Sequence, residues 1–161
     1  TIIYIFFKIN NQSKKCFKMF IYHINKMAYI KKSLTDSWST PTNIKNKLQD
    51  EYNFDDFDPC PLNHNPEFNG LEIEWATRTF VNPPYSRLKT TKKNGLGWVE
   101  KAHLEAQKGK LVVMLIPART DTSWFHDIIL KNNYKIIFIK GRLKFSNKGS
   151  APFPSILVIM K

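Results

Sequence analysis

Apolar positions recur along the chain at two spacings, and each spacing predicts a different kind of element. Ile44, Leu48 and Tyr52 repeat every four residues, which places them on one face of a helix. Thr40-Pro41 would supply the N-cap and first residue of this helix. Residues 111–116 are continuously apolar, which is typical of a strand buried on both faces of a sheet.

The same patterns predict the remaining elements, with Pro, Gly and Asn at their ends. Two further helices are expected, at residues 98–108 before Gly109 and after Thr122 or Ser123, where Trp124 and Phe125 would enter the core before Asn132-Asn133. The other expected strands are residues 54–57, 77–81, 136–139, 142–145 and 155–160, the last two forming an antiparallel hairpin. Strands that alternate with helices predict an α/β fold with a small mixed sheet, mostly parallel apart from the C-terminal hairpin and flanked by helices.

The first 26 residues differ in composition from the rest. They contain no acidic residue, and Ile, Phe, Tyr, Lys and Asn fill 20 positions. We expect residues 1–26 to be translated upstream sequence or a disordered extension, and residues 27–161 to form a single domain that begins at Met27. The apolar run at residues 2–7 is too short to cross a bilayer, and no signal peptide is recognisable. No membrane association is therefore expected.

The chain is strongly basic, with 25 Lys and Arg against 13 Asp and Glu and a net charge of +12. Without residues 1–26, 20 basic and 13 acidic residues still leave +7. Such an excess points to a polyanion, with nucleic acid first and a membrane surface second, whereas a solvated basic face is the simpler alternative. Two cysteines suit a reducing compartment, and Cys60 and His64 lack a second ligand pair, so no metal is expected.

Three unusual segments come directly after expected strands. They are Asp58-Pro59-Cys60, Asn82-Pro83-Pro84-Tyr85 and Pro117-Ala118-Arg119-Thr120-Asp121. Ligands of parallel sheets bind at the carboxyl ends of the strands, so this shared placement predicts one common site. Arg119 and Asp121 would either cap the following helix or line that site.

The segment Asn82-Pro83-Pro84-Tyr85 suits the recognition of a planar amine. Two prolines fix an extended turn, from which the Asn82 amide and the Pro83 carbonyl would point outward as acceptors beside the Tyr85 ring. Acceptors that bind both protons of an aromatic amine raise the electron density on its nitrogen and favour its attack. The alternative is a structural turn with Tyr85 packed against the core.

Residues 80–86 resemble the catalytic motif of S-adenosylmethionine-dependent amino-methyltransferases. Residues 35–160 are similar to the phage-type DNA N6-adenine methyltransferases (the phage Dam family). The matching segments are residues 36–41, 57–60, 98, 101–102, 117–122, 124–125, 141–145 and 151–155. The resemblance implies a Rossmann-like methyltransferase fold and site-specific transfer of a methyl group from S-adenosylmethionine to a flipped adenine.

The resemblance also implies roles for individual residues. Asn82, Pro83, Pro84 and Tyr85 would be catalytic, and the cofactor-binding residues would be Trp38, Thr40, Pro41, Asp58, Pro59 and Cys60. This chain departs from larger methyltransferases because no glycine cluster follows the first expected strand, and Gly70 is distant. Residues 59–81 are too few for a full βαβ unit and a further strand, so a truncated sheet is expected. Glu72 and Glu74 are candidates for holding the ribose hydroxyls.

Basic residues near the catalytic segment are expected to contact DNA phosphates. They are Arg87, Lys89, Lys92 and Lys93 in the following loop, and Arg142, Lys144 and Lys148 in the expected hairpin. A flipped adenine would stack on Tyr85, with Phe145 or Phe153 on its other face.

Several functional alternatives remain open at this point. The same segment would serve cytosine-N4, RNA adenine or a glutamine side chain, and the missing glycines also fit a catalytically degenerate DNA-binding protein. The expected setting is a monomer in the cytoplasm of a bacterial host, encoded by a phage or mobile element.

Overall fold

The computed structural model describes residues 38–63, 65, 67–93, 95–145 and 149–161. The expectation for residues 1–26 therefore lies outside the described residues. His64 and Lys148 lie outside them as well.

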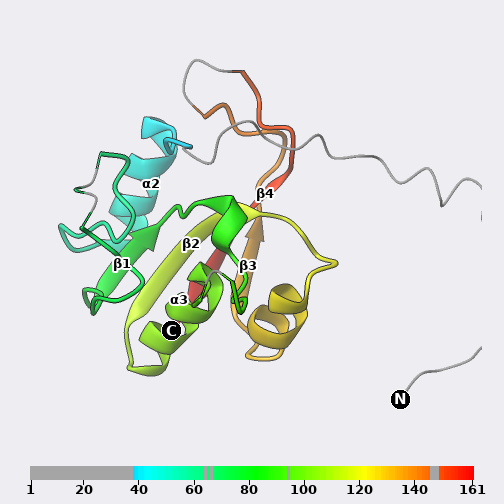
Figure 1. The fold of residues 1–161 in the computed structure, drawn as a ribbon. Coiled ribbons are helices and arrows are strands. Elements are labelled where there is room, and N and C mark those ends of the chain that lie inside the picture. Colours follow the sequence, from blue (N-terminus) through cyan, green and yellow to red (C-terminus); the bar gives the residue numbers. More distant parts are fainter. Residues whose placement is uncertain (1–37, 64, 66, 94, 146–148) are drawn as a thin grey trace, which may run out of the picture. The chain divides into compact units, whose positions relative to one another are not determined.

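Four strands form one mixed sheet in the order β1-β2-β4-β3 (Figure 1). They are β1 (Arg78–Val81), β2 (Leu111–Pro117), β3 (Lys135–Phe138) and β4 (Ser155–Met160). β1 pairs parallel with β2, whereas β4 pairs antiparallel with both β2 and β3. The predicted mixed α/β sheet is confirmed. The prediction that the sheet is mostly parallel is wrong for the strand pairs, because two of the three pairs are antiparallel. β4 lies between β2 and β3 and runs opposite to both.

The predicted hairpin of residues 142–145 with β4 is also wrong. Residues 142–145 contribute an isolated bridge, between Lys144 and Ser150, and β4 pairs elsewhere. Every residue of β4 is buried. A strand this apolar buries more surface with a neighbour on each side than it would at the edge of the sheet.

Residues 54–57 do not form the strand that their composition predicts. The Asp55 carboxylate accepts the backbone N–H of Arg78 at 2.8 Å and so occupies a donor that a strand ladder would use. The N–H of Phe57 turns back to the carbonyl of Asp55 at 2.8 Å. The Arg78 guanidinium donates to the carbonyls of Tyr52 and Asn53, which holds this bend against the start of β1.

Helices flank the sheet, as predicted. Helix α2 (Thr42–Tyr52) inserts Leu48 into the core, and α3 (Trp98–Gln107) packs on β2 and β4 (Figure 1). Gly109 follows α3 with φ +84°, as its position predicts. The π-helical turn η2 (Phe125–Leu130) lies beside α3, and the predicted core residues Trp124 and Phe125 are buried.

Neither predicted helix cap is confirmed. The residue preceding α2 is Pro41, without a side-chain cap, and the hydroxyl of Thr40 has another partner. The Thr122 hydroxyl donates to the carbonyl of Arg119 at 2.8 Å, and the helical turn that follows has no side-chain cap. Both hydroxyls therefore bind outside the helices that they were expected to start.

A buried carboxylate joins α3 to the loop before β1. The Glu105 side chain is 1% exposed and accepts hydrogen bonds from Lys101 at 2.7 Å, Lys108 at 3.1 Å and Lys110 at 2.8 Å. It also accepts the backbone N–H of Trp75 at 3.3 Å. Burial raises the pKa of Glu105, but these bonds outweigh burial and lower the pKa to about 2. The carboxylate is therefore ionised at neutral pH.

Candidate active site

The Asn82 corner (Asn82-Pro83-Pro84-Tyr85) leaves the sheet at the carboxyl end of β1, as predicted. It continues into the short 3-10 turn η1 (Tyr85–Arg87), in which the N–H of Arg87 binds the carbonyl of Pro84 at 3.1 Å. Pro83 and Tyr85 are buried, and Asn82 and Pro84 are half-buried. The strand and the two prolines thus hold Asn82 on a rigid support at the sheet edge.

Three hydrogen bonds fix the Asn82 carboxamide. Its Nδ2 donates to the carbonyl oxygen of Trp38 and, at 3.0 Å, to Oγ1 of Thr40. Because a carbonyl can only accept, the NH₂ group must face Trp38, and Oδ1 then faces Tyr85, whose hydroxyl donates to it at 2.8 Å. One lone pair of Oδ1 is left for a ligand. The sequence predicted a carboxamide that points outward as an acceptor. In the structure most of its hydrogen-bonding positions are already occupied within the protein.

Tyr85 does not offer an exposed ring. Its side chain is buried, and the ring meets Phe153 edge-on at 5.3 Å and Phe145 at 6.4 Å between centroids. This packing does not fit the expected stacking of a base between Tyr85 and either phenylalanine, because the three rings bury one another. Burial raises the pKa of Tyr85, so its hydroxyl stays protonated and donates to Asn82.

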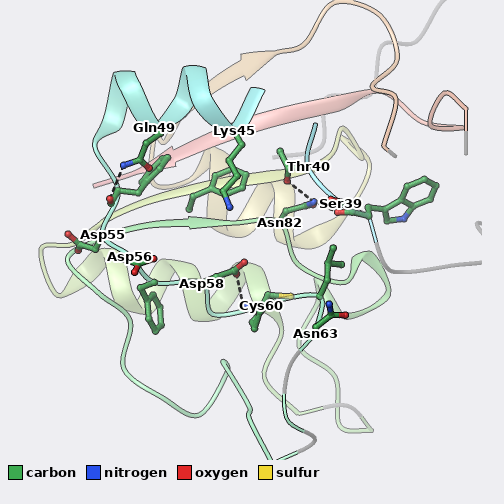
Figure 2. A pocket seen from close by; sticks show the side chains of 16 residues that line it. Ser39, Thr40, Lys45, Gln49, Asp55, Asp56, Asp58, Cys60, Asn63 and Asn82 are labelled. Atoms are coloured by element: carbon green, nitrogen blue, oxygen red, sulfur yellow. Dashed lines mark hydrogen bonds between the residues drawn. The ribbon is translucent and has the colours of Figure 1, made fainter. Parts of the chain in front are cut away.

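A cavity of about 540 Å³ opens beside Asn82 (Figure 2). Of the residues predicted for the site, five line it: Trp38, Thr40, Asp58, Cys60 and Asn82. The remaining predicted catalytic and cofactor residues are neighbours of these in the chain but do not line the cavity: Pro41, Pro59, Pro83, Pro84 and Tyr85. Two of the three segments that follow expected strands therefore meet, whereas Arg119 and Asp121 are exposed and lie outside the cavity.

The cavity carries charged groups that the sequence interpretation missed. Lys45 reaches into it from α2, and Asp55 and Asp56 line it together with Asp58 (Figure 2). The signal for these residues was available, because Lys45 lies on the helix that begins after Thr40, and Asp55 and Asp56 lie within three positions of Asp58.

The proposed ribose-binding acids lie elsewhere. Glu72 is exposed, and Glu74 pairs with Lys110 at 2.9 Å; neither lines the cavity.

The Asp58-Pro59-Cys60 loop has the predicted turn. The Asp58 carboxylate accepts the N–H of Cys60 at 2.8 Å. Burial, and to a lesser extent the charge of Asp58, raises the pKa of Cys60 to about 12, so a neutral thiol faces the cavity. Gly70 is distant in sequence but packs against this loop, since a Cβ there would lie 1.8 Å from the Pro59 carbonyl oxygen. Gly70 is therefore the glycine that permits close approach to the loop.

The basic residues predicted to bind DNA are on the surface. Lys89, Lys92 and Lys93 are exposed, and Arg87 is half-buried in η1 directly after the Asn82 corner. A bridge between Thr91 and Gly95 closes their loop into a tight turn.

A second basic segment also flanks the corner. Arg142 and Lys144 are exposed and alternate with buried Leu143 and Phe145, the latter in contact with Tyr85. Both basic segments therefore begin at the corner or touch it.

The described residues contain no cluster of three or more His, Cys, Asp or Glu side chains suited to a metal ion. None of their helices has the length and apolar character needed to cross a membrane.

Comparisons with known proteins agree with the motif. A family model described as DNA N-6-adenine-methyltransferase (Dam) matches residues 27–161. A curated DNA N-6-adenine-methyltransferase of Escherichia phage T1 is 30% identical over 121 residues, which cover 69% of this chain and 48% of the relative. The chain thus spans about half the length of that relative. No solved structure matches it.

Proposed function

The chain belongs to the DNA N-6-adenine-methyltransferase (Dam) family, and we propose that it methylates the exocyclic amine of adenine in DNA. One observation carries this proposal. The Asn82 carboxamide, fixed by three hydrogen bonds at the end of β1, faces a cavity of about 540 Å³ with one Oδ1 lone pair left over. A cavity of this size falls in the range of small-molecule sites.

The residues of the cavity fit S-adenosylmethionine as the methyl donor. This molecule combines a zwitterionic amino acid, a ribose diol, an aromatic base and a sulfonium cation, whose methyl group it supplies. Lys45 suits the carboxylate, whereas Asp55, Asp56 and Asp58 suit the amino group and the ribose hydroxyls. The rings of Phe57 and Trp38 provide apolar surface for the base.

The Asn82 corner suits the acceptance of a planar amine. Oδ1 of Asn82 offers one acceptor, and the Pro83 carbonyl, to which no described residue donates a hydrogen bond, offers a second. Two acceptors that bind the amine protons would increase the electron density on the amine nitrogen. This favours the attack of that nitrogen on the methyl group. Tyr85 serves this step through its hydrogen bond to Oδ1.

The target adenine has to leave the base stack to reach Asn82. Lys89, Lys92, Lys93, Arg142 and Lys144 are exposed cations around the corner, where they suit the phosphates that flank an extruded base. This DNA-directed chemistry fits the bacterial cytoplasm expected from the sequence.

The sheet fits a shortened Rossmann-like methyltransferase fold. Three strands run in one direction, and the site lies at the carboxyl end of one of them, β1, which suits that class of fold. No strand is found before β1 in the described part of the chain, which agrees with the expected truncation.

The test incubates the protein with labelled S-adenosylmethionine and DNA of varied sequence, followed by nucleoside analysis. The proposal predicts label in N6-methyladenine, loss of transfer in Asn82→Ala with DNA binding retained, and no change in Asn43→Ala, whose side chain is exposed on α2. Label in cytosine, RNA or protein would identify another acceptor amine. DNA binding without any transfer would identify a degenerate methyltransferase.

A further inference from the structure

One hydrogen bond joins two segments that lie 42 residues apart. Thr40 precedes α2, where its sequence position predicts a helix cap and the family resemblance implies a cofactor contact. The structure gives its hydroxyl a different partner, because Oγ1 accepts a proton from Nδ2 of Asn82 at 3.0 Å. Thr40 also lines the cavity, so one side chain touches both the cavity and the Asn82 corner.

This bond controls an orientation that the Asn82 side chain does not fix by itself. The terminal torsion of asparagine is broad, and turning it would exchange the positions of Oδ1 and Nδ2. The Trp38 carbonyl holds one N–H and the Tyr85 hydroxyl holds Oδ1, but these two bonds leave the second N–H unheld and allow the carboxamide plane to tilt. The Thr40 hydroxyl holds the second N–H and so defines the plane.

We infer that Thr40 is a positioning residue for methyl transfer, whose hydroxyl sets the plane of the Asn82 carboxamide so that the remaining Oδ1 lone pair meets the acceptor amine. This inference rests on the proposed function. Tyr85 completes the arrangement from the opposite side by donating to Oδ1 at 2.8 Å. The carboxamide is thus held by three hydrogen bonds, two donated by Nδ2 and one accepted by Oδ1.

A positioning role and a cofactor-binding role predict different kinetics for Thr40→Val, which removes the hydroxyl with little change of shape. A residue that only binds S-adenosylmethionine would raise the KM for that donor and leave kcat unchanged. A positioning residue lowers kcat and leaves both KM values within about twofold. Misplacement of a reacting group is costly, so we expect kcat to fall roughly 10- to 100-fold.

The experiment measures kcat and both KM values for the unmodified protein, Thr40→Val and Thr40→Ser. Thr42→Val is the matched control, because Thr42 is exposed at the start of α2 and does not line the cavity. The inference requires a low kcat in Thr40→Val, its rescue by Thr40→Ser and an unaffected control. An unchanged kcat in Thr40→Val, or an equal loss in both Thr40 variants, would overturn it. If Thr40→Val does not fold, Thr40→Ala removes the same hydroxyl without adding bulk.

A second measurement does not depend on methyl transfer. The side-chain NH₂ protons of Asn82, followed by NMR, should exchange slowly with solvent in the unmodified protein and in Thr40→Ser, and faster in Thr40→Val. Equal exchange in all three would refute the positioning contact. If the unmodified protein transfers no methyl group, the proposed function fails, whereas this measurement still decides whether Thr40 holds Asn82.

Discussion

Replacing Glu105 by Gln should destabilise the protein strongly at neutral pH. The change keeps the shape of the side chain but removes the charge from a carboxylate that is 1% exposed and binds three lysines. Lys101, whose side chain is 9% exposed, would then be left as a buried cation without its anion, and Lys110 would keep only its ion pair with the exposed Glu74. The N–H of Trp75 would lose a charged acceptor as well.

The size of the effect follows from the pKa of Glu105. The ordinary value of 4.5 falls to about 2 in the folded protein, which corresponds to about 3 kcal/mol of folding free energy. Because the folded pKa is the lower one, this stabilisation is present above about pH 4.5 and is lost as the pH falls toward 2. The Gln variant should therefore be about 3 kcal/mol less stable at pH 7, and the difference should shrink below pH 4.5.

Urea unfolding followed by tryptophan fluorescence, from pH 7 down to pH 3, measures both effects. Glu72→Gln is the control, because the Glu72 side chain is exposed, and we expect it to change the free energy of unfolding by less than about 0.5 kcal/mol. If Glu105→Gln matched the unmodified protein at pH 7, or if its deficit were the same at every pH, the ion pairs of Glu105 with the three lysines would not stabilise the fold.

Three further changes test other parts of the structure. Gly70→Ala should weaken binding of S-adenosylmethionine, because its Cβ would meet the Pro59 carbonyl oxygen at 1.8 Å; an unchanged Kd by calorimetry would contradict this contact. Lys92→Ala should reduce the slope of log K against log salt for DNA binding by about 1, and an unaltered slope would remove Lys92 from the interface. Arg78→Met should lower the free energy of unfolding by about 1.5–3 kcal/mol, since the guanidinium binds the carbonyls of Tyr52 and Asn53; urea unfolding within 0.5 kcal/mol of the unmodified protein would argue against this role.

Local patterns predicted the parts of the fold that local physics decides. The apolar run at β2, the periodicity of α2 and the glycine after α3 each determine one element with its immediate neighbours, and all three are confirmed. The position of Asn82 directly after a strand followed from the same kind of pattern. Its placement beside the cavity could be expected because parallel strands carry their ligands at one edge.

The failed predictions concern partners that are distant in sequence. The pattern of β4 shows that it is buried but not between which strands, so an adjacent hairpin was the default expectation. Thr40 has the sequence of a helix cap, yet Asn82 competes for its hydroxyl. Tyr85 has the sequence of a stacking platform, yet Phe145 and Phe153 bury its ring. The outcomes for Thr40 and Tyr85 were set by residues more than 40 positions away, and β4 pairs with strands that lie well outside its own neighbourhood in the sequence. No local pattern reports such partners.

The position of β4 has a consequence for protein synthesis. Of the four strands, β4 is translated last, although it occupies the middle of the sheet. Until residues 155–160 leave the ribosome, β2 and β3 each expose an apolar edge that can pair with other chains. Nascent chains halted before this point should therefore aggregate or require chaperones, and the protein gains its central sheet in one late step.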